Sequence, residues 1–204
     1  MIAIIYDGCG NLFSLSSSLE SLGIECKITS DKTEIENADK IILPGVGAFA
    51  DAAKKLKDSG LGKLVCDLAA QGKPILGICL GMQMLFEKSF EYGAHMGLGL
   101  IKGYVGPLEG QISKDLKIPH MGWNKLNLAK ADPIFKYTQP GDYMYFVHSF
   151  YARNCVENTL AFAEYGVAVP AIVKNGNVYG MQFHPEKSGA KGLALLKAFS
   201  EIGD

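Results

Sequence analysis

The sequence predicts an α/β protein with a mostly parallel central sheet, helices on both faces and an antiparallel β extension. Three observations support this class. Short apolar runs alternate with amphipathic helical patterns through the first 80 residues. The later segments are shorter and rich in β-forming residues. The chain has 204 residues, 48% of them hydrophobic, which suits a single domain over 1–204.

The first half reads as successive strand–helix units. The run IAIIY (2–6) is an apolar strand, and Asn11 is a suitable N-cap for a helix that Gly23 ends. Its apolar face consists of Leu12, Leu15, Leu19 and Leu22. Further strands are predicted at 24–29, 40–47 and 74–78, and further helices at 49–58, 61–71 and 80–86.

The second half is predicted to be largely antiparallel. β-rich pieces occur at 98–105, 123–128, 143–151 and 159–163. A hairpin over 170–183 turns at Asn175-Gly176, a favoured two-residue turn. A last helix is expected over 190–201.

Composition excludes several classes of function. The net charge of −1 favours neither nucleic acid nor an anionic membrane as partner. The start MIAIIYDG lacks a signal-peptide pattern, and no apolar run reaches the about 18 residues of a spanning helix. Five scattered cysteines without a C-x-x-C pair argue against a disulfide framework or a zinc site. A cytoplasmic protein is expected.

Cys79 lies where a strand is followed by a helix, in the pattern Gly-x-Cys-x-Gly. Small neighbours allow a sharp turn that presents a side chain, and free N–H groups there favour an anion. A nucleophile is one interpretation, and a small buried structural cysteine is the other.

A cysteine nucleophile needs a base, and His184 is the best placed of the four histidines. It directly follows a strand, Pro185 prevents that strand from continuing, and Glu186 can orient the imidazole. The alternative is an exposed His-Pro-Glu turn. His120 and His148 also have a structural interpretation, as strand or loop histidines bonded to backbone. No histidine pair has metal-ligand spacing, so no metal is expected.

The segment LPGVG (43–47) ends another strand. Gly45 and Gly47 would let backbone N–H groups point at a ligand, as an oxyanion hole requires. An ordinary turn is the alternative.

Taken together, these motifs resemble class I (triad) glutamine amidotransferases, which implies a flavodoxin-like three-layer fold. Within them, the chain is similar to the glutaminase subunits of imidazole glycerol phosphate synthase, an enzyme of histidine biosynthesis. The resemblance runs from about residue 2 to 200 and is carried by GNLFSL (10–15), LPGVGAF (43–49), GICLGMQ (77–83), GLGLI (97–101), PHMGWN (119–124), YFVHSFY (145–151) and QFHPEKS (182–188).

The resemblance implies glutaminase activity without a cofactor. Cys79 would attack the side-chain amide of glutamine, His184 would transfer protons and Glu186 would orient His184. The oxyanion would be held by the N–H of Leu80 and one from Val46–Gly47. The glutamine head group would be bound by Gln83, by the backbone of His148, Ser149 and Phe150, and by Glu91.

The resemblance also implies a heterodimer with a (β/α)₈-barrel cyclase, which uses the ammonia to make imidazole glycerol phosphate and AICAR. The positions expected to face this partner are Asn11, Trp123, Tyr145 and Lys187. Core packing is the alternative for Trp123, and Tyr145 lies in a strand whose tyrosines point to both faces if they alternate.

Three other functions remain open from sequence. Some relatives serve amidination of surface sugars instead of histidine synthesis. A degenerate amidotransferase-like domain could act as a non-catalytic regulatory subunit. A cysteine redox protein of similar fold is a third class, in which Cys66 or Cys79 would react with peroxide.

Overall fold

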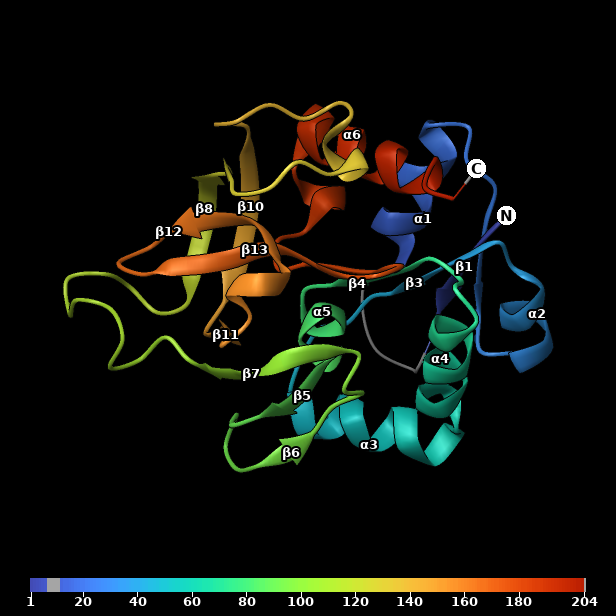
Figure 1. Ribbon diagram of the computed structural model, residues 1–204, viewed down its shortest axis with the longest axis horizontal. Helices are drawn as coiled ribbons and strands as arrows, with labels where there is room; N and C mark the ends of the chain where they lie inside the picture. Colours follow the sequence, from blue (N-terminus) through green and yellow to red (C-terminus); the bar gives the residue numbers. More distant parts are fainter. Residues whose placement is uncertain (7–11, 204) are drawn as a thin grey trace.

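An eight-stranded sheet crosses the centre of the computed structural model, which describes residues 1–6 and 12–203 (Figure 1). The strand order is β2-β1-β3-β4-β14-β13-β12-β9. The strands are β1 Ile2–Ile5, β2 Cys26–Thr29, β3 Lys40–Leu43, β4 Ile75–Ile78, β9 Asn127–Leu128, β12 Thr159–Glu164, β13 Ala168–Asn175 and β14 Val178–Met181. Pairing is parallel from β2 to β14 and antiparallel beyond it, so the predicted α/β class is confirmed. That the chain is one domain stays a prediction.

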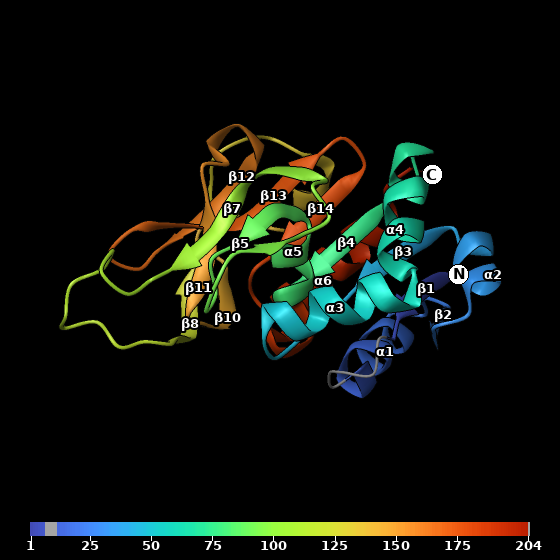
Figure 2. The ribbon, with the colours of Figure 1, turned by 90° about the horizontal axis from the view of Figure 1, so that it is seen from below.

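Helices cover both faces of this sheet and make three layers (Figures 1 and 2). α1 (Leu12–Ser21) and α6 (Gly189–Ser200) lie on one face, and α2 (Lys32–Asn37), α3 (Phe49–Ser59) and α4 (Leu61–Ala70) on the other. β1 shows why: Ile2 and Ile4 pack with the first pair of helices, whereas Ala3 and Ile5 pack with the second group. Alternate residues of a strand point to opposite faces, so a strand covered on both sides is apolar throughout.

The helix ends follow local capping chemistry. Gly23 adopts φ 72°, and the N–H groups of Gly23 and Ile24 bond the carbonyls of Glu20 and Leu19, which ends α1 as predicted. α2 was not predicted from sequence. Its signal is Asp31, whose carboxylate accepts the N–H groups of Thr33 and Glu34 at 2.8 and 3.1 Å.

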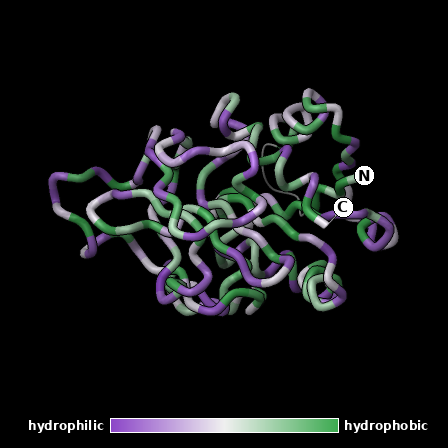
Figure 3. The backbone as a smooth tube through the Cα atoms, turned by 45° about the horizontal axis from the view of Figure 1, so that its top comes forward, coloured by the Kyte–Doolittle hydropathy of each residue, from purple (hydrophilic) through white to green (hydrophobic). Residues whose placement is uncertain are grey.

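Two smaller sheets form the antiparallel extension. β8 (His120–Lys125) pairs with β10 (Tyr143–His148), and we call this pair the β8–β10 ribbon. A four-stranded sheet contains β11 (Phe150–Arg153), β7 (Ile101–Pro107), β5 (Phe86–Ser89) and β6 (His95–Met96). The loop over 108–119 extends away from the body, while hydrophobic segments gather in the middle of the molecule (Figure 3).

Several boundaries differ from the sequence-based prediction; the piece predicted over 143–151, for example, is two strands, β10 and β11, in separate sheets. Two further differences have a clear physical reason. The helix predicted over 80–86 is only α5, Leu80–Met84, because Phe86 is fully buried and begins β5 by pairing with Ile101. In the β13–β14 hairpin Asn175 pairs with Val178, so Gly176 and Asn177 form the turn. Asn177 is held there because its side chain donates to the carbonyls of Ala69 and Lys73.

Short 3₁₀ helices occur at Pro133–Phe135, Val156–Asn158 and Pro185–Lys187. None of the helices among residues 1–6 and 12–203 is long and apolar enough to cross a membrane.

Candidate active site

Cys79 occupies a strained turn between β4 and α5. Its backbone angles are φ 54° and ψ −111°, a conformation that a residue with a side chain rarely adopts. The Cys79 N–H donates to the Met181 carbonyl at 2.7 Å, which ties the turn to the neighbouring strand β14. Cys79 as a whole is 8% exposed. The expected nucleophile-elbow geometry is therefore present.

The two flanking glycines have a different role from the one expected. Neither has a positive φ, and Cys79 itself makes the unusual turn. A Cβ on Gly77 would lie 2.7 Å from the Gly81 carbonyl oxygen, and one on Gly81 would lie 1.8 Å from the Leu43 carbonyl oxygen. The glycines allow α5 to lie directly against β3 and β4.

His184 and Glu186 form the second part of the site, just after β14. His184 Nδ1 lies 2.8 Å from Glu186 Oε1, and both side chains are buried. The Nδ1 contact leaves Nε2 for the thiol. Burial opposes a charge on His184, but the Cys79 thiol and the Glu186 carboxylate outweigh it and raise the His184 pKa to about 9. The surroundings of the imidazole therefore favour its protonated form.

A cavity of about 340 Å³ joins these groups to most of the predicted substrate residues. Its lining includes Val46, Gly47, Cys79, Leu80, Gln83, Glu91, His148, Ser149, Phe150, His184 and Lys187. They come from segments up to 141 positions apart in the chain (187 − 46). The cavity is partly open to solvent and is large enough for a small substrate.

Of the two predicted oxyanion donors, one is already engaged. The Leu80 N–H donates to the Gly45 carbonyl at 3.3 Å. Gly47 has φ 95° and open space around its Cα, and Val46 is exposed. The segment Gly45–Gly47 therefore lies at the thiol. In this structure the Leu80 N–H is hydrogen-bonded to a carbonyl of that segment, so it does not point freely into the cavity.

The proposed head-group residues have structural partners of their own. Gln83 Nε2 donates to the Phe150 carbonyl at 3.0 Å and to Gln182 Oε1 at 3.1 Å, so its oxygen is what it offers to a substrate. Glu91 Oε2 accepts the Phe49 N–H at 2.8 Å and caps α3. The His148 ring is fully engaged by hydrogen bonds, which leaves the backbone of this segment for a ligand.

Comparison with known proteins decides the family. A family model described as glutamine amidotransferase class-I matches residues 4–201. The chain belongs to this class I glutamine amidotransferase family. It is 49% identical over 202 residues to imidazole glycerol phosphate synthase subunit HisH of Listeria monocytogenes, covering 99% of this chain and 96% of that protein. The subunit of the same name from Bacillus subtilis is 46% identical, with the same coverage of both chains.

A solved structure described as a glutamine amidotransferase has the same fold as this amidotransferase. Its TM-score is 0.77 at 21% identity, over 98% of each chain. The flavodoxin-like three-layer arrangement expected from the sequence is thus confirmed.

Of the predicted partner-facing residues, Trp123 and Lys187 are exposed and Tyr145 is half-buried. Trp123 is 55% exposed, and its ring meets that of Tyr145, directly opposite it in the β8–β10 ribbon, at 6.0 Å. Tyr143 and Tyr145 share one face of β10 because they are two residues apart. Lys187 is exposed beside the active-site cavity. Asn11 lies outside the described residues.

Tyr92 and Gln182 were missed by the sequence reasoning. Tyr92 lines the substrate cavity with φ 50°, and its exposed ring contacts Phe150 edge-on at 5.8 Å. The Tyr92-Gly93 turn was its only sequence signal. Gln182 is fully buried beneath Gln83. Its position in an apolar strand end, beside His184, is unusual enough to have been a clue.

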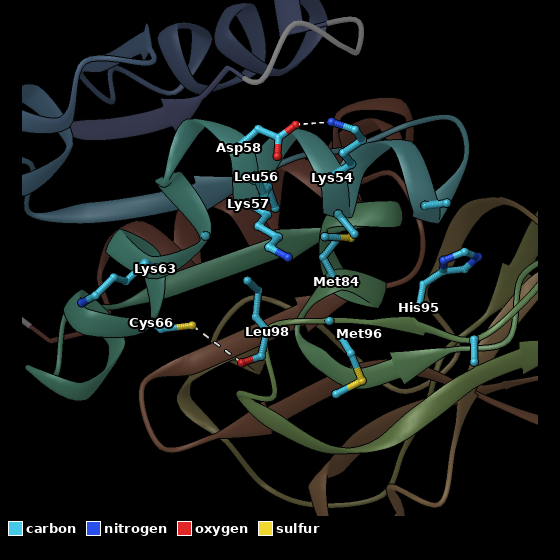
Figure 4. A pocket seen from close by; sticks show the side chains of 15 residues that line it. Lys54, Leu56, Lys57, Asp58, Lys63, Cys66, Met84, His95, Met96 and Leu98 are labelled. Atoms are coloured by element: carbon cyan, nitrogen blue, oxygen red, sulfur yellow. Dashed lines mark hydrogen bonds and ion pairs between the residues drawn. The ribbon is translucent and has the colours of Figure 1, made fainter.

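A second, larger cavity of about 770 Å³ lies between α3, α4 and β6, away from the catalytic residues (Figure 4). Lys57 points into it, and Cys66 donates to the Leu98 carbonyl at 3.6 Å. Burial raises the pKa of Cys66, and raises that of Cys155 to about 11. Neither thiol has the environment of a peroxide-reactive thiolate.

Among the described residues no three His, Cys, Asp or Glu side chains are grouped as a metal site.

Proposed function

We propose that this chain is the glutaminase subunit of an imidazole glycerol phosphate synthase. It would hydrolyse glutamine to glutamate and pass ammonia to a (β/α)₈-barrel cyclase, which makes imidazole glycerol phosphate and AICAR. The observation that carries the proposal is the Cys79 thiol at a strained turn, opening with His184 into one cavity of substrate size. The identity to subunits named for this synthase supports the assignment of the pathway.

The chemistry begins when the Cys79 thiol gives its proton to His184. The Cys79 sulfur attacks the side-chain carbonyl carbon of glutamine and forms a tetrahedral intermediate. The imidazolium of His184 gives its proton to the amine, the C–N bond breaks and ammonia leaves, which forms the glutamyl thioester. Neutral His184 then takes a proton from water as the water attacks the thioester. Glutamate departs, and the thiolate–imidazolium pair is restored.

Stabilising the oxyanion requires a change at the Gly45 carbonyl. The Leu80 N–H can serve the oxyanion only after its bond to Gly45 is broken, because an N–H has a single proton to donate. Rotation of the Gly45–Val46 peptide would remove the carbonyl and could present the Val46 N–H instead. We expect low glutaminase activity from the isolated subunit, and higher activity when the partner and its acceptor ligand are bound.

The partner would dock on the aromatic face of the β8–β10 ribbon, with the exposed Trp123 and the half-buried Tyr145 at its centre and Lys187 next to the cavity mouth. Aromatic side chains that are exposed in a free subunit are typical anchors of protein interfaces.

The decisive experiment compares glutamine and ammonia as nitrogen sources in the complex with the cyclase. Cys79→Ala should lower glutamine-dependent turnover by at least about 10³-fold, because the nucleophile is lost. Turnover with added ammonia should remain within about twofold of wild type, because ammonia bypasses the thiol. Equal loss with both nitrogen sources would contradict the role of Cys79.

The same assay separates the other functions. A complex that turns over ammonia but never glutamine would indicate a non-catalytic subunit. Glutamine hydrolysis that no histidine-pathway acceptor stimulates would indicate another acceptor, such as a surface sugar.

A further inference from the structure

The inner face of the β8–β10 ribbon carries a histidine pair that the reaction does not use. His120 and His148 are directly opposite in the strand register, and His120 Nδ1 lies 2.9 Å from His148 Nε2. Both side chains are buried. The His120 ring is stacked between Tyr165 at 3.9 Å and Phe146 at 4.8 Å, so it has no room to turn away.

The contact between His148 and the Phe150 carbonyl determines which atom donates in each hydrogen bond of the histidine pair. His148 Nδ1 lies 2.9 Å from the Phe150 carbonyl, which can only accept, so Nδ1 carries the proton. His148 Nε2 is then an acceptor, and His120 Nδ1–H is its donor. His120 Nε2 in turn accepts from Asn124 Nδ2 at 3.4 Å. The Asn124 amide also donates to the Glu164 carbonyl at 2.9 Å.

Both histidines must be neutral for this arrangement, and their surroundings keep them so. Burial lowers the pKa of His148 to about 3, with the neighbouring His120 and then His184 contributing, and burial lowers the pKa of His120 to about 4. Near pH 7 each ring nitrogen of the two histidines therefore has a hydrogen-bond partner.

This series of hydrogen bonds, from Asn124 through His120 and His148 to Phe150, ends at the substrate cavity. The Phe150 carbonyl that accepts from His148 also accepts from Gln83 Nε2 at 3.0 Å. Gln83, Ser149 and Phe150 line the cavity with Cys79. One carbonyl thus fixes both the orientation of the Gln83 amide and the course of the backbone beside it.

We propose that His120 is a positioning residue of the glutamine site: by donating to His148 it holds the Phe150 carbonyl, and through that carbonyl Gln83, in the geometry that binds the glutamine head group. This inference rests on the proposed glutaminase function. His120 lies behind the partner-facing residues, since Trp123 and Met121 occupy the other face of the same strand.

Two matched variants separate the hydrogen bond from the packing. His120→Phe keeps a ring between Tyr165 and Phe146 but has no donor. His120→Asn places an amide N–H near the position of Nδ1. In the complex with the cyclase, His120→Phe should raise KM for glutamine about tenfold with kcat changed less than about threefold, the size expected for losing one buried donor. His120→Asn should recover KM to within about threefold of wild type.

Two controls and one independent measurement distinguish loss of this hydrogen bond from loss of stability. Ammonia-dependent turnover should be unchanged in both variants, and His95→Phe, outside the histidine pair, should leave KM for glutamine unchanged. Nitrogen NMR shifts of wild type should show His148 and His120 protonated on Nδ1. They give an answer even if the variants do not fold.

An unchanged KM in folded His120→Phe, failure of His120→Asn to recover KM, or protonation of His148 on Nε2 would each overturn the inference. Failure of the proposed function looks different, because wild type itself would then lack glutamine-dependent turnover.

Discussion

Individual residues shape the surroundings of the proposed nucleophile of this amidotransferase. Cys79 accepts an unfavourable backbone conformation, which costs on the order of 1–3 kcal/mol and has to be offset by the surrounding structure. The protonated form of His184 is stabilised by Cys79 on one side and by the Glu186 carboxylate on the other. The proposed base, His184, therefore depends on its orienting group, Glu186.

Replacing Glu186 by Gln tests this dependence. The loss of the carboxylate should lower the His184 pKa from about 9, so that the imidazolium disappears at lower pH than in wild type. Glutamine-dependent kcat should fall about 10²–10⁴-fold, because the imidazole is no longer held in the productive tautomer. NMR titration of the His184 ring measures the first effect, and steady-state kinetics the second. An unchanged titration midpoint would contradict the role given to Glu186.

At the scale of secondary-structure elements, close packing of α5 against β3 positions the elbow. Gly81→Ala should destabilise the fold by about 2–4 kcal/mol, because its Cβ would overlap the Leu43 carbonyl. Gly62→Ala in α4 is the matched control. The nearest atom to its Cβ is 3.2 Å away, and alanine gains about 1 kcal/mol of helix propensity. Urea unfolding measures both. Equal effects would show that α5 can shift freely.

The β8–β10 ribbon should be sensitive to acid. A histidine whose pKa is lowered by folding stabilises the native state above its ordinary pKa of 6.5, and this contribution is lost as pH falls towards the folded value. For His120 and His148 the window runs from pH 6.5 to about 4 and about 3. Between pH 6.5 and 4.5 the free energy of unfolding should fall less in His120→Phe than in wild type, by on the order of 1–2 kcal/mol. Identical slopes in urea titrations would argue against two buried neutral histidines.

The whole molecule places its catalytic cavity and its proposed docking face on adjoining segments. Tyr145 illustrates the link, because its carbonyl accepts the His184 N–H at 3.0 Å while its side chain lies beside Trp123. A partner that moves the ribbon would therefore act on the backbone of the proposed base, His184.

Trp123→Ala tests the docking face in the assembled enzyme. Trp123 is 55% exposed, so the free energy of unfolding of the isolated subunit should change by less than about 1 kcal/mol. Affinity for the cyclase, measured by calorimetry, should fall at least about tenfold, as expected for a central aromatic anchor. The exposed Val156→Ala, outside the ribbon, serves as the control. Large destabilisation with undiminished affinity would instead assign Trp123 to the core.

Sequence by itself determined most of the order of strands and helices, with α2, β5 and β6 missed, and it identified Cys79, His184 and Glu186 as candidates. These depend on local chemistry: apolar periodicity, capping residues and a cysteine or histidine placed just after a strand. It also predicted which segments supply the cavity, although it could not place them together.

Only the tertiary structure decided the features that depend on contacts between distant segments. Phe86 leaves the helical pattern because a strand from 101 onward pairs with it, and Glu91 caps a helix that begins 42 residues earlier. The Leu80 N–H is occupied by a carbonyl of another loop, and His120 meets His148 across two strands. Hydrogen bonding and close packing between such segments depend on their positions in the folded chain. A local sequence pattern does not specify those positions.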